Sequence, residues 1–559
     1  MRGTKRMQTQ GRSRTAWLWW NLVGIPLVIL STLVLFESAL AHSTLANSPE
    51  ADSSSGKNSL AESRPNIIVI YTDDQGCGDV SCLNPNAKFQ TPNLDRLAAE
   101  GIMFSDAHCS DTVCTPSRYG LLTGRYCWRT ELKRSVLGAE RACLIEDGRM
   151  TLASFCRQNG YATAMVGKWH LGMDFPGDRQ SRDWSKPVVD MPLDKGFDYF
   201  FGIPASLNYG VLAWFEGRYA KVPPVMYTQK KKNAIAIDDY RIQPPYDPVA
   251  KVLGGTNQWG IVQGQLEIAS DFVDSECLTR FTDQAIDWVE RHRRGEDGEK
   301  PFFLYLPYTS PHKPVIPIDR FKGKSDAGAY GDFMMETDWQ IGRLLDSLER
   351  LGIRDQTMVV FSSDNGPENT WKKRAEQFNH QSNLIYREGK RSIYEGGHRV
   401  PLFIRWPQRI QGGSISARAV CQTDLLATLA ELFDNTLPDD AGEDSVSFLN
   451  EFAKSTASSP SPDRSPMVHH SINGGFAIRA GRWKLIMEHR KQPMELYDLT
   501  NDPSEKKNLI KMHPDLVQSL TSQLTRIVQN GRSTPGAVQS NDRIWWDDLT
   551  WITPAVENE

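Results

Sequence analysis

The sequence predicts an α/β fold: a large, mostly parallel sheet sandwiched by helices, followed by a smaller C-terminal domain with an antiparallel sheet. Two continuous apolar, β-branched runs, residues 66–72 and 357–363, are typical of strands buried on both faces of such a sheet. Helical patterns alternate with these runs and with further short apolar runs. Both long runs end in acidic and amide residues. Because ligands bind outside the carboxyl ends of parallel strands, we expect the functional site at that edge of the sheet.

The N-terminus has the pattern of an export signal. Basic residues precede an apolar run at residues 16–36, and the small residues Ala39 and Ala41 follow it. We therefore expect residues 1–41 to be a signal peptide, with a membrane anchor through residues 16–36 as the alternative because the run is long. In either case the catalytic part would be exported, as a periplasmic or secreted protein. Residues 42–63, rich in Ser, Asn and Glu, are expected to form a linker.

Regular structure is expected over residues 64–438, which we interpret as the catalytic domain. Proline placement, capping residues and apolar spacing predict helices near residues 91–98, 151–155, 279–293 and 330–351, the last on the surface, and strands at 162–167 and 302–306. Residues 181–264 lose this periodicity and gain Trp, Tyr, Pro and Lys. We expect long loops there, lying over the sheet and shaping substrate entry.

The remainder of the chain reads as a connector and a small domain. Residues 439–465 are rich in Asp, Ser and Pro, as connectors are. Residues 466–559 are expected to form a C-terminal α+β subdomain, with strands at 476–479, 483–486 and 495–499 and a helix at 514–528.

Composition narrows the class of protein. A formal net charge of -4 gives no reason to expect nucleic acid as a partner. Nine cysteines in 559 residues are too few for a disulfide scaffold. Several of them lie in the first third of the chain, where one or two local bridges could form: Cys77, Cys82, Cys109, Cys127, Cys143 and Cys156. No Cys-x-x-Cys pair occurs, so we do not expect a thiolate zinc site.

Two strand ends together indicate a metal site. Asp73 and Asp74 follow the first long apolar run, and Asp364 and Asn365 follow the second. A single pair of this kind is more often a turn or a helix cap. Oxygen ligands without histidine or thiol suit a hard cation, so we expect calcium, with magnesium as the alternative. A cation would also relieve the repulsion among crowded carboxylates.

A second motif places a cysteine where anions are favoured. Cys114 is followed by Pro116 and Arg118, which predicts a helix that begins near the proline and carries the arginine one turn on. The helix N-terminus and the guanidinium would both attract an anion. Further basic candidates are Lys168, His170, His312 and Lys390. A cation and several basic side chains together form a pocket for a tetrahedral oxyanion such as sulfate or phosphate.

These motifs resemble a known family. Residues 114–118 (Cys-Thr-Pro-Ser-Arg) with residues 122–125 (Leu-Thr-Gly-Arg) resemble the signature of the type I sulfatases, and residues 167–172 resemble their second signature. The likeness is to the arylsulfatase and N-acetylgalactosamine-6-sulfatase members and covers nearly all of the mature chain. It implies an alkaline-phosphatase-like fold. It also implies that Cys114 is oxidised to formylglycine (3-oxoalanine) by a formylglycine-generating maturation enzyme, so that this cysteine is unavailable for a disulfide.

The resemblance also implies a role for each candidate residue. Calcium would be held by Asp73, Asp74, Asp364, Asn365 and the formylglycine made from Cys114. Arg118 and Lys168 would steady the hydrated aldehyde, and the sulfate ester would be bound by Lys168, Lys390 and His312. Ser206 matches a family serine near the site, although the residues after it depart from the pattern. Residues 370–385 also depart, with extra Lys and Arg.

A mechanism follows from these implied roles. One hydroxyl of the hydrated aldehyde, near Asp364 and the cation, would attack sulfur in line. His312 would protonate the departing alcohol. His170 would take the proton of the second hydroxyl and so expel sulfate. A plain cysteine could not perform this last step, because it has no second hydroxyl.

The expected substrate is a sulfated carbohydrate. Two segments could line a sugar-binding pocket: residues 214–219, with aromatic and basic side chains, and the pair His469 and His470. No hydrophobic hairpin of the kind expected in sterol sulfatases follows residue 36. One alternative is a phosphodiesterase or phosphonate monoester hydrolase of the same superfamily. Another is a secreted protein that binds sulfated glycans without turnover, for which a complete set of acid, base and metal ligands would have no use.

Overall fold

The computed structural model of the protein describes residues 64–178, 181–229, 247–250, 265–295, 298–452, 464, 466–542 and 549–552. The predicted signal peptide and linker, residues 1–63, lie outside the described residues. Within the described part, no helix combines the length and apolarity needed to cross a membrane. The α-helices are α1 Pro92–Glu100, α2 Cys114–Thr123, α3 Leu152–Gln158, α4 Cys277–Arg294, α5 Gly328–Arg350, α6 Trp371–Phe378, α7 Glu395–His398, α8 Leu425–Leu432 and α9 Pro514–Gln529.

A ten-stranded sheet forms the centre of the protein, in the order β15-β2-β14-β13-β1-β12-β4-β5-β7-β8. Its five middle strands, from β13 to β5, run parallel, and antiparallel strands extend both sides. The mostly parallel sheet predicted from the sequence is therefore confirmed. The strands are β1 Asn66–Asp73, β2 Ile102–Phe104, β4 Ala162–Lys168, β5 Tyr199–Ile203, β7 Phe215–Glu216, β8 Tyr219–Ala220, β12 Phe302–Pro311, β13 Thr357–Ser363, β14 Leu402–Arg405 and β15 Ser414–Ser416.

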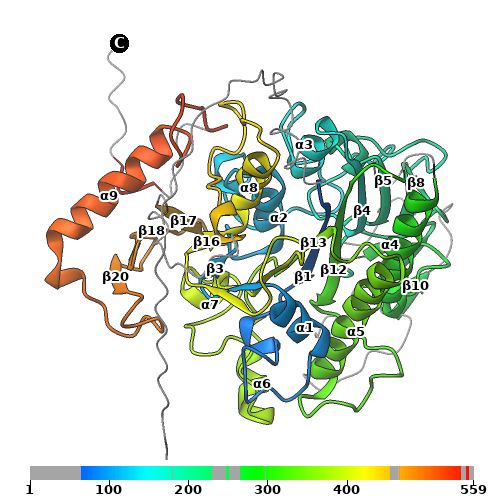
Figure 1. Cartoon of the computed structure of the whole chain (residues 1–559), viewed down its shortest axis with the longest axis horizontal. Coiled ribbons are helices and arrows are strands. Elements are labelled where there is room, and N and C mark those ends of the chain that lie inside the picture. Colours follow the sequence, from blue (N-terminus) through cyan, green and yellow to red (C-terminus); the bar gives the residue numbers. More distant parts are fainter. Residues whose placement is uncertain are drawn as a thin grey trace, which may run out of the picture. The chain divides into compact units, whose positions relative to one another are not determined.

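Helices cover both faces of this sheet. Figure 1 shows α1, α4 and α5 on one side of the central strands and α2, α3 and α8 on the other. All eight residues of β1 are buried, as expected for an apolar strand between two helical layers. Helix α5 was predicted to lie on the surface, and one side of it does, with Asp346, Glu349 and Arg350 exposed, but the rest is more deeply buried than expected. It packs against α1, α4 and β12, so that even its acidic residues Asp332, Glu336 and Asp338 are buried.

The structure differs from two further expectations. Strand β12 was expected to end at Pro307, but it continues to Pro311, with an irregular register opposite the end of β1. Residues 181–229, expected as loops, contain several short strands, three of which widen the main sheet. The remaining strands of this part are β3 Ala107–His108, β6 Val211–Leu212, β9 Met226–Gln229, β10 Asp247–Ala250, β11 Gln265–Ile268 and β16 Val420–Cys421.

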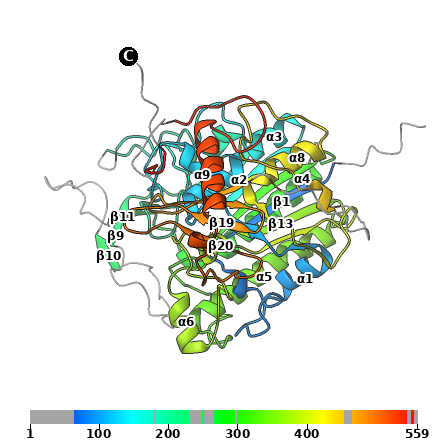
Figure 2. The same ribbon diagram turned by 90° about the vertical axis from the view of Figure 1, so that its left-hand side faces the viewer.

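The C-terminal part forms a separate four-stranded antiparallel sheet, as predicted. Its strands are β17 Met467–His470, β18 Phe476–Ala480, β19 Trp483–Ile486 and β20 Glu495–Asp498, in sequence order. Helix α9 crosses one face of this sheet (Figure 2). Tyr126 and Trp128, which follow α2, belong to the same hydrophobic core as this sheet. The small sheet is therefore packed directly onto the segment that follows Cys114.

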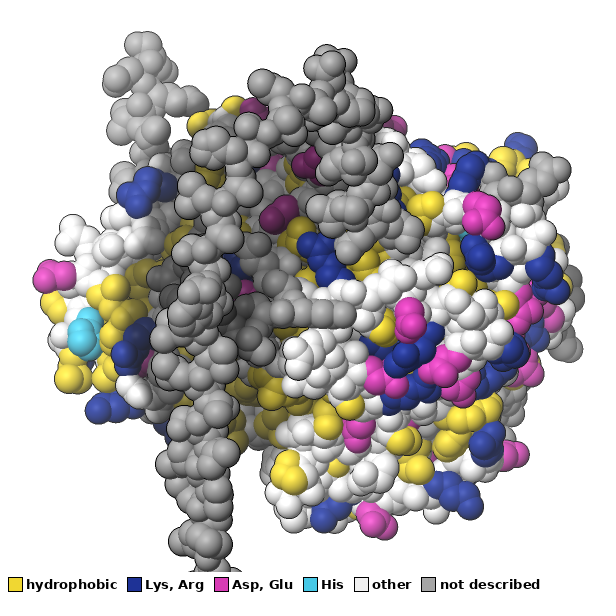
Figure 3. All heavy atoms as spheres, in the orientation of Figure 1, with side chains coloured by type: hydrophobic (Ala, Val, Ile, Leu, Met, Phe, Trp, Pro, Cys, Tyr) yellow, Lys and Arg dark blue, Asp and Glu magenta, His cyan; other side chains and the backbone are white. Residues whose placement is uncertain are grey.

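Charges of both signs are interspersed on the face drawn in Figure 3. On the side where α4 and α5 lie, Arg343 is 2.6 Å from Asp283 and Arg350 is 2.8 Å from Glu290. Exposed pairs of this kind contribute little to stability, but they prevent a patch of one sign. This agrees with the near-neutral charge of the whole chain.

Candidate active site

Cys114 lies at the start of α2, where it is almost fully buried. Val113, in extended conformation, precedes it, and Pro116 lies in the first turn. The helix begins two residues earlier than the proline predicted, so that Cys114 itself is the first helical residue. Its sulfur is 3.4 Å from an Asp73 carboxylate oxygen and 3.5 Å from Lys390 Nζ. The helix N-terminus therefore presents this side chain between an acid and a base.

The two acidic strand ends meet beside Cys114. Asp73 is the last residue of β1, and Asp364 follows the neighbouring parallel strand β13. Asp74 lies in the left-handed region, with φ 68°, and its backbone N–H donates to Asp364 Oδ1 over 3.1 Å. Asn365 Nδ2 donates to Asp74 Oδ1 over 2.8 Å. The polar ends of β1 and β13 thus form one site, because parallel strands end at the same edge of the sheet.

Three buried cations balance the three carboxylates. Arg118 donates to Asp364 Oδ2 from NH2 over 2.8 Å and from Nε over 3.1 Å. Lys168 Nζ pairs with Asp73, and Lys390 Nζ pairs with Asp74. His312 Nε2 lies 3.8 Å from Asp74 Oδ2. We call this group the active-site cluster: Asp73, Asp74, Cys114, Arg118, Lys168, His312, Asp364, Asn365 and Lys390.

Burial and neighbouring charges shift the pKa values of this cluster. Burial, and then the charge of Asp73, raises the pKa of Asp364 to about 6. Although burial alone would raise it, Lys390 and His312 hold the pKa of Asp74 well below its usual value. Burial lowers the pKa of His312 to about 3, and Lys390 and Lys168 act in the same direction. The free site is therefore close to electrically balanced, with His312 neutral.

The residues of the cluster fit a divalent cation. Donor atoms of Asp73, Asp74, Cys114 and His312 all lie within 4.8 Å of one another. Asp74 Oδ2 and Asn365 Oδ1 are buried and have no hydrogen-bond partner among the described residues. Buried oxygens are rarely left unpaired, so these two atoms point to a missing partner. Carboxylate and amide oxygens are ligands for hard cations such as calcium.

His170 and Ser206 were also predicted as site residues, but neither makes a hydrogen bond to the active-site cluster through its side chain. His170 is buried with φ 61°, and its Nε2 lies 3.1 Å from the Leu137 carbonyl oxygen. Its Nδ1 has no hydrogen-bond partner in the described part of the chain. Ser206 is buried after β5, and its hydroxyl makes no hydrogen bond to any described residue. The structure thus does not connect Ser206 to the cluster by a polar contact.

The sequence reasoning overlooked a neighbouring ion pair. Arg391 NH2 donates to Glu368 Oε2 over 2.8 Å, and Lys313 Nζ lies 3.5 Å from the same oxygen. Arg391 directly follows Lys390, and Lys313 directly follows His312. Glu368 lies three residues after Asn365. Only their position next to recognised site residues could have indicated them, because a Glu and an Arg far apart in sequence carry no signal of pairing.

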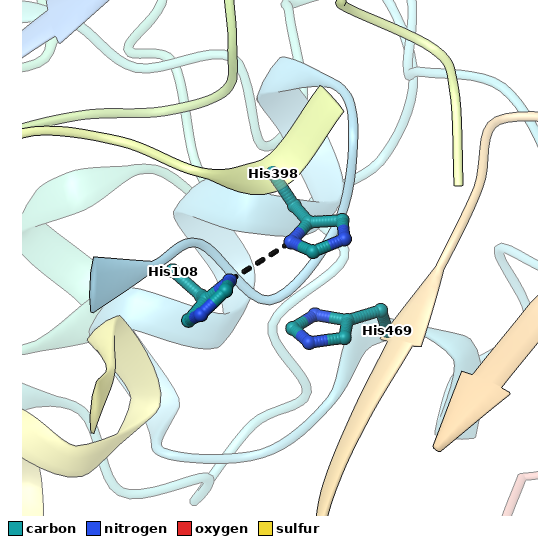
Figure 4. A group of neighbouring side chains, drawn as sticks. All are labelled: His108, His398 and His469. Carbon is teal, nitrogen blue, oxygen red and sulfur yellow. Dashed lines mark hydrogen bonds between the residues drawn. The ribbon is translucent and has the colours of Figure 1, made fainter. Parts of the chain in front are cut away.

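The two segments expected to line a sugar pocket are buried in part: residues 216–218 are half-buried and Tyr219 is exposed, but the other residues are buried. Trp214 and Phe215 are fully buried, and the Trp214 ring is 4.6 Å from that of Phe272. His469 is fully buried in what we call the histidine cluster, with His108 and His398 (Figure 4). The sugar-pocket interpretation of Trp214, Phe215 and His469 was therefore wrong. All nine cysteines lie in described segments and are unpaired.

The histidine cluster joins three elements. His108 comes from β3, His398 from α7 and His469 from β17. The Nδ1 atoms of His108 and His398 are 2.9 Å apart, and the rings of His398 and His469 stack with centroids 3.8 Å apart (Figure 4). Burial, followed by Arg399, lowers the pKa of His108 to about 4. Burial also lowers the pKa values of His398 and His469, so the three imidazoles are neutral near pH 7.

The chain is similar to several known proteins. A family model described as Sulfatase matches residues 65–435, and a model of the C-terminal region of N-sulphoglucosamine sulphohydrolase matches residues 387–530. An N-acetylgalactosamine-6-O-sulfatase of Bacteroides thetaiotaomicron is 33% identical over 492 residues, covering 83% of this chain and 93% of that protein. Human arylsulfatase A is 30% identical over 499 residues, covering 82% and 87%. A solved structure from work on glycosaminoglycan metabolism by Bacteroides thetaiotaomicron superposes with a TM-score of 0.70 at 32% identity, covering 83% of this chain and 99% of that one.

Proposed function

The chain belongs to the sulfatase family, and we propose that it hydrolyses sulfate esters of a carbohydrate with the residue at position 114 as nucleophile. One observation carries this proposal. Buried cations and unpaired oxygens surround Cys114 at a helix N-terminus, an arrangement that suits a tetrahedral anion next to a metal ion. The carbohydrate part rests on the likeness to the N-acetylgalactosamine-6-O-sulfatase.

We propose that Cys114 is converted to formylglycine by a maturation enzyme, as its signature implies. Burial, and then the carboxylates of Asp364 and Asp73, raises the pKa of the Cys114 thiol. An unmodified cysteine here would stay protonated and would react poorly. Hydrated formylglycine supplies a hydroxyl nucleophile and a second hydroxyl whose deprotonation releases the sulfate.

We propose calcium as the metal, held by Asp73, Asp74, Asp364, Asn365 and the modified residue 114, with magnesium as the alternative. The cation supplies positive charge against the sulfate oxygens. Lys168 and Lys390 add two more charges beside it, and Arg118 holds Asp364 in place through two hydrogen bonds. Together these groups favour an anion that gains charge on its oxygens during the reaction.

The contacts of two histidines support the roles that we propose for them. His312 Nδ1 lies 2.6 Å from the Lys313 carbonyl oxygen, so this nitrogen carries a proton and Nε2 faces the cluster. A bound sulfate would oppose Lys390 and Lys168 and would raise the low pKa of His312, which lets it donate a proton to the leaving alcohol. His170 donates from Nε2 to Leu137, so its Nδ1 is free to accept a proton from residue 114.

Three measurements test the proposal. Mass spectrometry of the peptide containing residue 114, from the native host, should find an aldehyde instead of a thiol. Turnover of an aryl sulfate should far exceed that of an aryl phosphate diester. A panel of defined sulfated oligosaccharides should identify a sulfated sugar that is hydrolysed faster than the aryl sulfate. Preference for the phosphate diester would contradict the sulfatase assignment for this chain.

We also propose that the protein is exported. The basic and apolar N-terminus with Ala39 and Ala41 supports this. The mass of the mature protein from the native host distinguishes cleavage after Ala41 from a retained anchor.

A further inference from the structure

Strand β17 of the C-terminal sheet ends with two adjacent histidines that face opposite sides. Successive side chains of a strand alternate in direction, so His469 and His470 have different surroundings. His469 lies in the histidine cluster (Figure 4). His470 instead places Nδ1 2.7 Å from Asp111 Oδ2, and both residues are buried. The backbones of Asp111 and His470 also form an isolated parallel bridge. One strand therefore reaches the segment that immediately precedes Cys114.

Asp111 in turn holds the start of α2. Its Oδ1 accepts the Thr112 N–H over 2.6 Å, and its carbonyl oxygen accepts the Ser117 hydroxyl over 2.9 Å. The carboxylate of Asp111 thus holds the backbone just before Cys114, and its carbonyl oxygen holds the first turn of the helix. An acidic side chain at a helix N-terminus is also favoured by the helix dipole.

Thr112 connects the same segment to two other regions. Its hydroxyl accepts the Ile472 N–H, from the loop after β17, over 3.2 Å. Its carbonyl oxygen accepts the Arg391 N–H over 2.9 Å, next to Lys390. A shift of residues 111–113 would therefore displace the nucleophile relative to Lys390 and the acidic strand ends.

We propose that His470 is a positioning residue for the nucleophile at position 114, acting through Asp111. This rests on the proposed function. The His470 ring is itself held against Phe476, with centroids 4.9 Å apart in an edge-on arrangement. The small C-terminal sheet thereby contributes to catalysis through its contact with the segment before residue 114. A displacement of about 1 Å in a reacting group can reduce turnover by about 100-fold, so a modest loosening of this contact has a measurable effect.

The neighbouring histidine provides a matched control. His469→Leu changes the same strand, at a buried position, and leaves Asp111 untouched. His470→Leu removes the bond to Asp111. His470→Asn keeps an N–H donor near the position of Nδ1 and serves as the rescue variant. All three are compared by kcat and KM on an aryl sulfate, by melting temperature, and by the fraction of residue 114 converted to the aldehyde.

For His470→Leu, we expect kcat per converted site to fall about 10- to 100-fold, with KM within about threefold of the wild type. His470→Asn should recover most of this loss, and His469→Leu should stay within about twofold of the wild type. If His470→Leu does not fold, Asp111→Asn removes the same charge-assisted contact from the other side and should give the same kcat loss.

Three results would overturn the proposal: an unchanged kcat in His470→Leu, an equal loss in His469→Leu, or a loss explained entirely by a lower converted fraction. Failure of the proposed function is separate from these, because it appears as absence of sulfatase turnover in the wild type itself.

Discussion

The active-site cluster and the histidine cluster are both buried, and acids and bases meet in or around both. They differ in how many of their polar atoms are paired with other side chains. In the active-site cluster, Asp74 Oδ2, Asn365 Oδ1 and His170 Nδ1 nearby have no hydrogen-bond partner among the described residues. Around the histidine cluster, Lys484 is 3.0 Å from Glu395 and 2.8 Å from Glu505, and Arg479 donates to Asp106 over 2.7 Å. Unpaired carboxylate and amide oxygens beside other acids suit a cation. The unpaired nitrogens of His469 instead lie in a cluster bordered by paired cations, which indicates structural stabilisation.

The same comparison explains why three neighbouring imidazoles need not hold a metal. Lys484 Nζ is 3.0 Å from His398 Nε2, and Arg479 NH1 is 2.9 Å from His108 Nε2. The rings of His398 and His469 are nearly parallel, at 11°. A single ion cannot lie in the planes of two stacked rings, and added positive charge would face the existing cations. Proximity of ligand types is therefore weak evidence for a metal where ring geometry and neighbouring cations oppose one.

The largest expected effect concerns the nucleophile. Cys114→Ala should reduce sulfatase turnover by roughly 10⁴-fold or more, the scale found when a covalent nucleophile is removed. The fold should persist, because alanine at a buried position removes only one sulfur atom. Measurement of kcat alongside the melting temperature checks both. Full sulfatase turnover in this variant would refute the assignment of residue 114.

His312→Ala should reduce kcat by about 10²- to 10⁴-fold, the usual contribution of a general acid. The loss should shrink as the leaving group becomes more acidic, because a good leaving group needs no protonation. A series of aryl sulfates with leaving groups of different pKa measures this. An equal loss across the series would show that His312 only binds substrate.

Lys484→Met tests the closed pairs of the histidine cluster. It leaves Glu505 buried without its cation and removes one of the two cations of Glu395, which keeps Arg399, and should destabilise the protein by about 3–5 kcal/mol. Arg350→Met, which removes an exposed pair with Glu290, should change stability by at most about 1 kcal/mol. Urea unfolding midpoints of the two variants give the comparison. Equal effects would mean that burial does not distinguish these pairs.

Calcium binding should depend on pH through Asp364. Its pKa is raised to about 6, so below that pH a proton occupies the carboxylate and must leave before the cation binds. We expect the affinity to fall by about tenfold per pH unit below about pH 6 and to be nearly constant above it. Calorimetric titration of chelator-treated protein tests this. Asp364→Asn should bind weakly at all pH values.

The smallest effect is expected for His469→Leu. Both ring nitrogens of His469 are buried without a hydrogen-bond partner among the described residues. Replacing an unpaired buried polar group with an apolar one of similar size is neutral or stabilising by up to about 1 kcal/mol. A clear loss of stability would reveal a partner of this imidazole and would weaken the comparison between the two clusters.

Much of the site could be predicted from local sequence. The apolar runs that became β1 and β13 are long enough to identify, and their polar ends needed only the rule for parallel strands. Strands β6, β7 and β8 have two residues each, so periodicity could not show them. The contact of His470 with Asp111 joins residues 359 positions apart, which no local pattern encodes. Burial of Trp214 likewise depends on tertiary packing.

The position of β1 has a consequence for synthesis in the cell. This fully buried strand pairs with β12 and β13, and its first residue, Asn66, contacts Phe302, 236 positions later. At about 5–20 residues per second, the ribosome needs on the order of 10–50 s to supply that partner. During this interval an apolar strand has no neighbour on either side. We therefore expect the nascent chain to depend on chaperones until β12 has emerged, and to aggregate when they are limiting.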